Sequence, residues 1–188
     1  MHQLHCIAPT ADLLASLRPK QMGVQCAVTD DAVEIFLHGI IGDEYTETDS
    51  LSVGRILAAN RGKPVTLRVN SPGGLAYDGV AMYNAIDAHD GKTTGIIEGL
   101  AGSAASLAVV ACDIVKCHSS AAFHPHYSLV VAIGHQAAIR DALAVQERLD
   151  SDLEVVYSEA SGRTIEQVRA DLLGPHGEGT RFSADEAL

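Results

Sequence analysis

Blocks of apolar residues separated by polar turns predict strands and helices in alternation. Residues 24–28 and 33–40 are apolar runs on either side of a short polar turn, which predicts a β-hairpin. An acidic stretch then precedes apolar residues at helical spacing over 51–57, and the β-branched run at 65–69 predicts the next strand. Strand, helix and strand in this order indicate the start of a parallel βαβ arrangement.

The next two strands each lead into a glycine-rich turn and a helix. Residues 70–74 form such a turn before a helical pattern, and residues 93–97 predict the strand that follows. That strand leads into residues 99–112, which carry no charge and predict a tight turn into a buried helix. Because neighbouring parallel strands place both turns at the same edge of the sheet, we expect the functional site at this edge.

The C-terminal half predicts two short strands, two helices, a loop and a last helical fragment. In chain order these are residues 114–117, 121–127, 136–160, 164–172, 174–179 and 183–188. Pro125 marks the second strand as an edge or irregular strand, and Thr164 with Gln167 predicts a capping box for the second helix. The chain ends inside the last fragment, which favours truncation at Leu188.

The length and composition suit a single domain of the α/β class. A chain of 188 residues can bury a substantial core without disulfides or metal. We expect residues 1–20 to form an N-terminal arm and residues 21–188 to form one domain with a mostly parallel sheet flanked by helices. Trp is absent and aromatic residues make up 4% of the chain, so the core must consist mainly of Ala, Val, Ile and Leu.

Charge and cysteine content narrow the partners and the location. The formal net charge of -11 opposes binding to nucleic acid, which needs clustered Lys and Arg. The four cysteines lack close CxxC spacing and are expected to be reduced, as in a cytoplasmic protein. The first residues do not resemble a signal peptide, and no apolar run reaches the ~20 residues of a membrane span. We expect no membrane partner.

Ser106 lies within the uncharged stretch at residues 99–112 and is a candidate nucleophile. Hydroxyl groups are usually excluded from apolar segments unless they are hydrogen-bonded or functional. Gly73 and Gly74 favour the catalytic hypothesis, because their unobstructed N–H groups can bind an oxyanion. The alternative is a helix of small residues packed against a sheet, in which Ser103 and Ser106 bond back to the preceding turn.

A hydroxyl nucleophile needs a base, and the chain has nine histidines. His124 and His126 are expected on one face of a strand because side chains alternate, so both can face the same cleft. A two-histidine metal site is the alternative for this pair, but no carboxylate or cysteine lies close by with convincing ligand spacing. We therefore expect neither a metal nor a cofactor.

Three motifs in order resemble a known family: residues 70–74 (NSPGG), the helix with Tyr83-Asn84, and residues 102–106 (GSAAS). They are similar to the proteolytic subunit of the Clp protease, and most of all to the ClpP-like peptidases encoded in phage and prophage head-assembly regions. The likeness covers about residues 33–188. It implies the ClpP/crotonase-like fold, with repeated ββα units and a long handle helix, and a serine peptidase with Ser106 as the nucleophile.

The resemblance also implies roles for other residues. Phage-type members carry a histidine roughly twenty positions after the nucleophile and a glycine shortly after it, and His126 lies between Ser106 and Gly134 at this spacing. His126 would then take the Ser106 proton and return it to the leaving amine. The oxyanion would be held by the N–H of Leu107 with that of Gly73 or Gly74.

The third member of the site departs from the family pattern. The family carries an acid just before an aromatic-containing segment, and the aligned position here is Gly179, with Glu178 one residue away. Three arrangements remain open: Glu178 orients His126, Asp171 does so, or the site is a dyad. Losing the orienting acid usually lowers catalysis by several orders of magnitude without removing it.

We therefore expect a serine endopeptidase that cleaves peptide bonds through an acyl-enzyme on Ser106, with or without help from an AAA+ ATPase. The resemblance implies protein or peptide substrates and a homo-oligomeric ring, with residues 136–160 as the handle between rings. The phage-type likeness implies capsid or scaffold proteins as substrates, in the cytoplasm of a bacterial host.

Three other functions are weighed against this one. The first is a catalytically weak or inactive assembly or scaffold component that keeps the fold. The second is an acyl-CoA enzyme of the crotonase type, which would have no use for Ser106 and His126 where they stand. The third is a Ser-Lys peptidase, which is disfavoured because Lys116 lies in a predicted strand and nothing marks it as a base.

Overall fold

The computed structural model describes residues 24–42 and 48–187. The predicted arm at residues 1–20 lies outside the described residues, as does Leu188. Within the described ranges, none of the helices is both long and apolar enough to cross a membrane.

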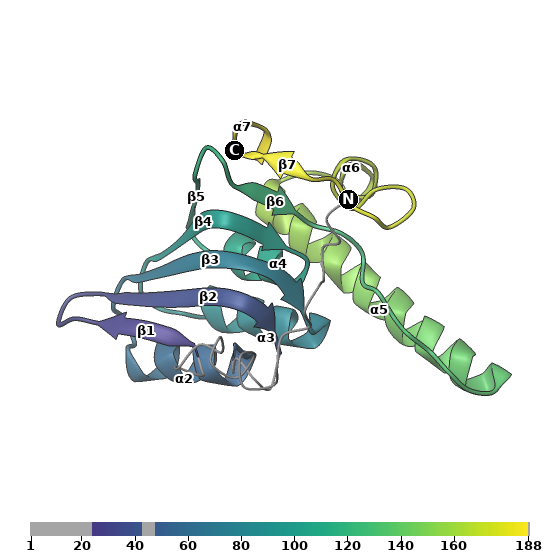
Figure 1. Cartoon of the computed structure of the whole chain (residues 1–188), viewed down its shortest axis with the longest axis horizontal. Helices are drawn as coiled ribbons and strands as arrows, with labels where there is room; N and C mark the ends of the chain where they lie inside the picture. Colours follow the sequence, from purple (N-terminus) through teal and green to yellow (C-terminus); the bar gives the residue numbers. More distant parts are fainter. Residues whose placement is uncertain (1–23, 43–47, 188) are drawn as a thin grey trace, which may run out of the picture.

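One mixed sheet forms the centre of the described part of the chain (Figure 1). Its strands are β1 (Gln25–Val28), β2 (Val33–Ile41), β3 (Val65–Gly74), β4 (Thr93–Gly102), β5 (Ile114–Cys117), β6 (Ala122–His124) and β7 (Phe182–Ser183). The order is β1-β2-β3-β4-β6-β7, and β5 pairs with β4 beside β6. Strands β2 to β6 are parallel, whereas β1 and β7 pair antiparallel at the two edges. The predicted hairpin and the mostly parallel α/β sheet are confirmed.

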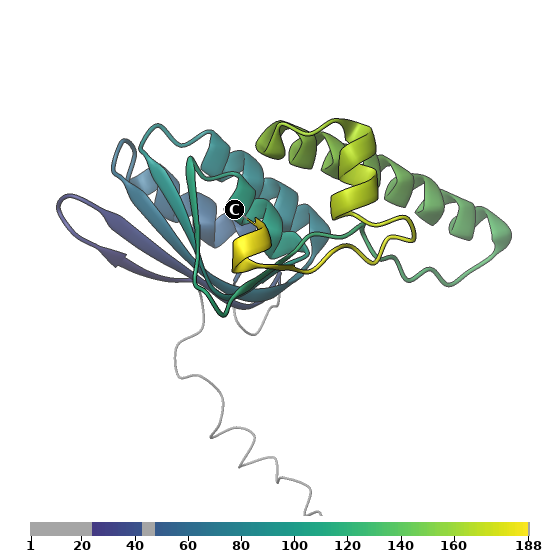
Figure 2. The same cartoon turned by 90° about the horizontal axis from the view of Figure 1, so that it is seen from above.

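The helices divide into a layer on the sheet and a projecting arm. They are α2 (Ser50–Ala59), α3 (Ala76–Asp87), α4 (Ala104–Val110), α5 (Gln136–Ser161), α6 (Ile165–Gln167) with the π-helical turn η1 (Val168–Leu172), and α7 (Ala184–Ala187). Helices α2, α3 and α4 cover one face of the sheet, and the 26-residue helix α5 extends away from it (Figures 1 and 2). The predicted long helix and the capping box of Thr164 and Gln167 are confirmed.

Alternating burial along the strands explains why helices α2, α3 and α4 pack on one face of the sheet. In β2, Val33, Ile35 and Leu37 are buried and face the helices, while the residues between them are more exposed. The same period of two places Leu67 and Ile97 in this core. A second apolar cluster joins α4, α5 and η1 through Leu107, Leu153, Tyr157, Val168, Leu172 and Leu173.

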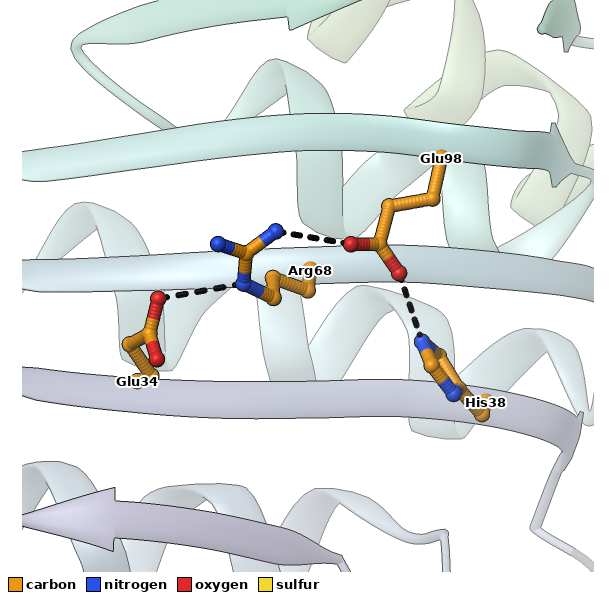
Figure 3. Close-up of polar contacts among 4 residues, drawn as sticks. All are labelled: Glu34, His38, Arg68 and Glu98. Carbon is orange, nitrogen blue, oxygen red and sulfur yellow. Dashed lines mark hydrogen bonds and ion pairs between the residues drawn. The ribbon is translucent and has the colours of Figure 1, made fainter. Parts of the chain in front are cut away.

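The other face of the sheet carries a row of polar side chains across three strands. Arg68 donates to Glu34 at 3.0 Å and to Glu98 at 2.7 Å, and Glu98 also contacts Nε2 of His38 at 3.1 Å (Figure 3). The Arg68 guanidinium holds the pKa of Glu98 below its ordinary value. These partly exposed pairs align the strands without large stabilisation, because water screens them.

Strands β3 and β4 run further than the sequence predicts. Residues 70–74 and 99–102 were expected as turns, yet both belong to strands. The extension follows from pairing with neighbouring strands, since Gly73 pairs with Ile40 and Gly102 pairs with His124. Strand β6, in contrast, ends at His124, because Pro125 cannot donate to a ladder.

Candidate active site

The two glycine-containing segments meet at the carboxyl edge of the sheet, as predicted. Gly73 has φ +97, and a Cβ at its position would lie 2.5 Å from Cβ of Ser103 and 2.6 Å from the carbonyl oxygen of Gly102. The Ala104 nitrogen lies 2.9 Å from the same point. The backbone of β3 therefore presses directly against the turn between β4 and α4, and a side chain at residue 73 would prevent this contact.

Ser103 forms the turn between β4 and α4 in a strained conformation. Its φ of 50° and ψ of -128° make it the one non-glycine residue with positive φ in the described ranges. A side chain at such a sharp turn from strand to helix is typical of nucleophilic serines in hydrolases. Ser103 is partly exposed, and its hydroxyl has no hydrogen-bond partner among the described residues. Sequence reasoning treated Ser103 only as a packing residue.

Ser106, the nucleophile predicted from the sequence, is fully buried in α4. Its hydroxyl donates to the carbonyl oxygen of Ser103 at 2.5 Å and lies 2.6 Å from the Tyr157 hydroxyl. No histidine is hydrogen-bonded to it in the part of the chain that the structure describes. The Ser106 hydroxyl therefore bonds back to the turn that precedes α4, and its role as the nucleophile stays a prediction.

The predicted oxyanion donors do not lie equally close to the serine turn. The N–H of Gly73 donates to Oγ of Ser71 at 3.1 Å and adjoins Ser103, whereas the backbone of Gly74 packs on Ile41 of β2. Leu107 is buried within the second apolar cluster. The backbone nitrogen of Ala104, which directly follows Ser103 at the start of α4, also lies near Gly73, and sequence reasoning did not consider it.

His126 and His124 lie side by side where β6 ends, with ring centroids 5.4 Å apart. Nδ1 of His126 lies 2.5 Å from the carbonyl oxygen of Tyr127, and a carbonyl only accepts, so Nδ1 carries the proton and Nε2 is free to act as a base. Nε2 of His124 donates to the carbonyl oxygen of Glu178 at 3.1 Å, and burial lowers the pKa of His124. The serine turn is joined to this strand, because the N–H of Ser103 donates to the carbonyl of His124 at 2.9 Å.

Neither predicted acid contacts the His126 ring. Gly179 does lie beside His126, but with φ +73 its backbone packs on the Pro125 carbonyl, and a Cβ there would lie 2.6 Å from Cβ of His126. Glu178 reaches the histidine pair through its main-chain carbonyl, which accepts from His124. Asp171 pairs with Arg163 at 2.9 Å. Among the described residues, neither the Glu178 nor the Asp171 carboxylate is hydrogen-bonded to His126, and the group that orients this ring in catalysis stays a prediction.

An ion pair between the buried Glu154 and the exposed Arg169 adjoins the segment that follows His126. The Tyr127 hydroxyl donates to Glu154 of α5 at 2.6 Å, and Arg169 donates to both oxygens of Glu154 at 2.8 Å. Arg169 holds the pKa of Glu154 below its ordinary value, and burial together with Glu154 raises the pKa of Tyr127 to about 12. Sequence reasoning missed this cluster because its members are 27 and 15 residues apart.

Other features of the region do not add ligands. Within the described ranges, no group of three His, Cys, Asp or Glu residues is placed to hold a metal ion, and Lys116 lies on β5. A cavity of about 310 Å³ lies behind α4 and is lined mainly by apolar side chains, with Tyr157 and Phe123 among them. Neither Ser103 nor the two histidines line it.

The strained turn at Ser103, the backbone of Gly73 and the two histidines thus lie at the same edge of the sheet. The family model described as Clp protease matches residues 25–188, and the chain belongs to this family.

Relatives of the chain are bacterial proteolytic subunits. It is similar to the "ATP-dependent Clp protease proteolytic subunit" of Porphyromonas gingivalis (strain ATCC BAA-308 / W83), with 29% identity over 172 residues that cover 88% of this chain and 75% of that protein. It is also similar to "ATP-dependent Clp protease proteolytic subunit 1" of Leifsonia xyli subsp. xyli, with 29% identity over 178 residues, 89% of this chain and 85% of the relative. The Bacteroides fragilis subunit is 28% identical over 141 residues, which cover 73% of this chain and 67% of that protein. Family and relatives together support a peptidase.

Proposed function

We propose that this chain is a serine endopeptidase that cleaves peptide bonds through an acyl-enzyme. The observation that carries the proposal is the contact between Gly73 and the strained turn at Ser103. The N–H of Ser103 also donates to the carbonyl of His124, which lies in the strand that leads to His126. Acyl transfer requires a nucleophile, main-chain donors and a base, and the proposal assigns these roles to groups at this edge of the sheet.

Two serines are candidates for the nucleophile, and the geometry favours Ser103. Ser106 is the candidate from the family spacing, and the oxyanion donors would then be the N–H of Leu107 with that of Gly73 or Gly74. However, Ser106 is fully buried and its hydroxyl already donates to a carbonyl, so it has no path to a substrate in this conformation. Ser103 has a partly exposed side chain without a hydrogen-bond partner among the described residues.

In the proposed reaction, Oγ of Ser103 attacks the scissile carbonyl carbon while Nε2 of His126 takes its proton. The negative charge on the carbonyl oxygen is then stabilised by the N–H groups of Gly73 and Ala104, and the Gly73 N–H leaves Oγ of Ser71 to reach it. His126 returns the proton to the leaving amine, and water hydrolyses the acyl-enzyme by the same steps. The Tyr127 carbonyl, in place of a carboxylate, holds Nδ1–H of His126.

The test is covalent labelling with a fluorophosphonate probe, followed by mass spectrometry that locates the adduct, and cleavage of a casein-like substrate by the same preparation. We expect one adduct per chain, on Ser103, and measurable cleavage. An adduct on Ser106 would reinstate the family-spacing candidate. Absence of both labelling and cleavage in a folded preparation would refute the peptidase.

The second candidate function is an assembly or scaffold component without catalysis. The observation that favours it is Gly179, which occupies the place of the family's acid and leaves His126 with a main-chain partner. A protein that forms oligomers but reacts with no serine-directed probe would support this function.

A homo-oligomer and protein substrates belong to the proposal, as the names of the relatives refer to a proteolytic subunit. Support comes from apolar side chains that are exposed on α5 and on the segment before it, namely Leu129, Val131, Ile133, Ile139, Leu143 and Val145. Sedimentation at micromolar concentration is expected to show an assembly larger than a monomer, and a monomer alone would contradict it. An AAA+ ATPase partner, capsid or scaffold substrates and a cytoplasmic location are the finer parts of the proposal, and they follow from the family and the phage-type likeness.

A further inference from the structure

Side chains of α5 hold the segment that follows His126. Residues 125–133 belong to no helix or strand, so their backbone has no ladder to bond to. The N–H of Ser128 instead donates to Oδ1 of Asp150 at 2.8 Å, and the Ser128 hydroxyl donates to the same oxygen at 2.6 Å. The carbonyl of Ser128 accepts from the side-chain amide of Gln146 at 2.7 Å. Ser128 is therefore fixed to α5 at its N–H, its hydroxyl and its carbonyl.

The peptide group between Tyr127 and Ser128 joins Asp150 to His126. Its carbonyl accepts from Nδ1 of His126 at 2.5 Å, and its N–H donates to Asp150. Because a peptide group is planar and rigid, a bond that fixes its N–H also fixes the direction of its carbonyl. A carboxylate that accepts from the N–H also polarises the amide, which makes the carbonyl oxygen a stronger acceptor. The His126 ring thus meets a carboxylate through one intervening peptide group.

A second carboxylate of α5, one turn further along the helix, holds the Tyr127 side chain. The Tyr127 hydroxyl donates to Glu154 at 2.6 Å, and Arg169 donates to both oxygens of Glu154 at 2.8 Å. Glu154 therefore anchors the phenol, whereas Asp150 binds the peptide group that contacts His126. Of the two carboxylates, Asp150 has the more direct connection to the ring.

The two acids predicted from the sequence do not supply this connection. Glu178 reaches the histidine pair only through its main-chain carbonyl, which accepts from His124 at 3.1 Å. Asp171 forms an ion pair with an arginine. Among the described residues, the Asp150 carboxylate is the one that is hydrogen-bonded to the peptide group holding His126.

We propose that Asp150 is the positioning acid of this site, and that it acts on His126 through the peptide group between Tyr127 and Ser128. The proposal rests on the proposed function with His126 as the base, and it holds whichever serine attacks. No proton passes along the chain: Nδ1 keeps its proton, while Nε2 takes the proton of the nucleophile and returns it. Asp150 keeps the ring in this tautomer and in this orientation.

The experiment compares Asp150→Ala and Asp150→Asn with wild type and with a matched control, Asp152→Asn. Asp152 is another carboxylate of α5, and it pairs with Arg148 at 3.3 Å, away from Ser128. For a fluorogenic peptide, we expect kcat in Asp150→Ala to fall by about 10-fold to 100-fold, with KM within about two-fold. Asp150→Asn keeps an acceptor for the N–H without the charge and should lose less, and Asp152→Asn should match wild type.

The tautomer of His126 is the measurement that a merely structural role would not change. In protein with 15N-labelled histidine, correlation spectra show which ring nitrogen carries the proton, and His126→Gln assigns the signal. We expect the Nδ1–H tautomer in wild type and in Asp152→Asn. In Asp150→Ala we expect a mixture with Nε2–H, because the carbonyl that accepts from Nδ1 is no longer held in place.

Several outcomes would overturn the positioning role of Asp150. One is a wild-type kcat in Asp150→Ala, and another is a loss that appears in KM alone. An unchanged His126 tautomer in that variant would do the same, as would an equal loss of kcat in Asp152→Asn. Cleavage by His126→Gln at the wild-type rate would show that this ring is not the base and would end the proposal. If Asp150→Ala fails to fold, Asp150→Asn decides by the same measurements.

The proposed function and the positioning role fail differently. A folded wild-type protein that neither cleaves the peptide nor reacts with a fluorophosphonate probe would overturn both. A wild type that cleaves and labels, with an Asp150→Ala variant that does so equally fast, would overturn the positioning role and leave the peptidase intact.

Discussion

A Ser103→Ala variant is expected to lose peptide cleavage by about 10³-fold or more and to lose fluorophosphonate labelling. The change removes the one hydroxyl that lies on the strained turn beside Gly73 with no partner among the described residues. Removing a nucleophilic serine eliminates the acyl-enzyme route and leaves only the weak acceleration that oxyanion binding and substrate positioning provide.

The measurement is kcat/KM for a fluorogenic peptide in wild type, Ser103→Ala and the control Ser119→Ala. Ser119 is exposed in the turn between β5 and β6, and it takes no part in the contact between Gly73 and the Ser103 turn. Its variant should therefore behave as wild type. Thermal unfolding must show that all three proteins are folded. Cleavage by Ser103→Ala at the wild-type rate would remove Ser103 from the mechanism and return attention to Ser106.

The second large effect is expected from Gly73→Ala, which should lower kcat/KM by about 10²-fold or more. At φ +97 a side chain is strained, and the new Cβ would lie 2.5 Å from Cβ of Ser103. The backbone of β3 must then move away from the serine turn, and the N–H of Gly73 moves with it. The strain by itself should reduce stability by about 1–3 kcal/mol.

Gly62→Ala is the matched control, because it separates strain from contact. Gly62 also has a positive φ of +74, but a Cβ there meets nothing within 4 Å. Its variant should show a comparable loss of stability in denaturant unfolding and unchanged kcat/KM. If Gly73→Ala retains activity within about two-fold of wild type, the contact between β3 and the serine turn has no role in catalysis.

Gly179 stands where the family carries an acid, and no other described residue is an obvious substitute for that acid in direct contact with His126. The Gly179 backbone packs on the Pro125 carbonyl, and a Cβ at residue 179 would lie 2.6 Å from Cβ of His126. The His126 ring instead donates to the carbonyl of Tyr127, whose hydroxyl is held by Glu154 of α5. A main-chain carbonyl fixes the tautomer as a carboxylate does, but it adds no negative charge to stabilise the imidazolium. We therefore expect a slower enzyme than one with a complete triad.

The sequence by itself determined the elements and the edge at which the site lies. Two apolar runs on either side of a polar turn mark β1 and β2, and the glycines at residues 70–74 and 99–102 mark the ends of β3 and β4. These signals are local, because they depend on side-chain direction and backbone freedom at each residue. Their position after consecutive parallel strands was sufficient to bring them together.

Only the tertiary structure decided which serine is available. Ser103 and Ser106 lie three residues apart in one apolar stretch, and the family motif with the spacing to His126 selects Ser106. The two serines nevertheless differ in exposure. The difference comes from Tyr157, 51 residues further along, which buries Ser106 and takes it as a partner, while Gly73 meets Ser103 from another strand. Burial and hydrogen-bond pairing depend on which segments pack together, so the partial exposure of Ser103, the burial of Ser106 and the close packing of Gly179 on His126 became visible only in the folded chain.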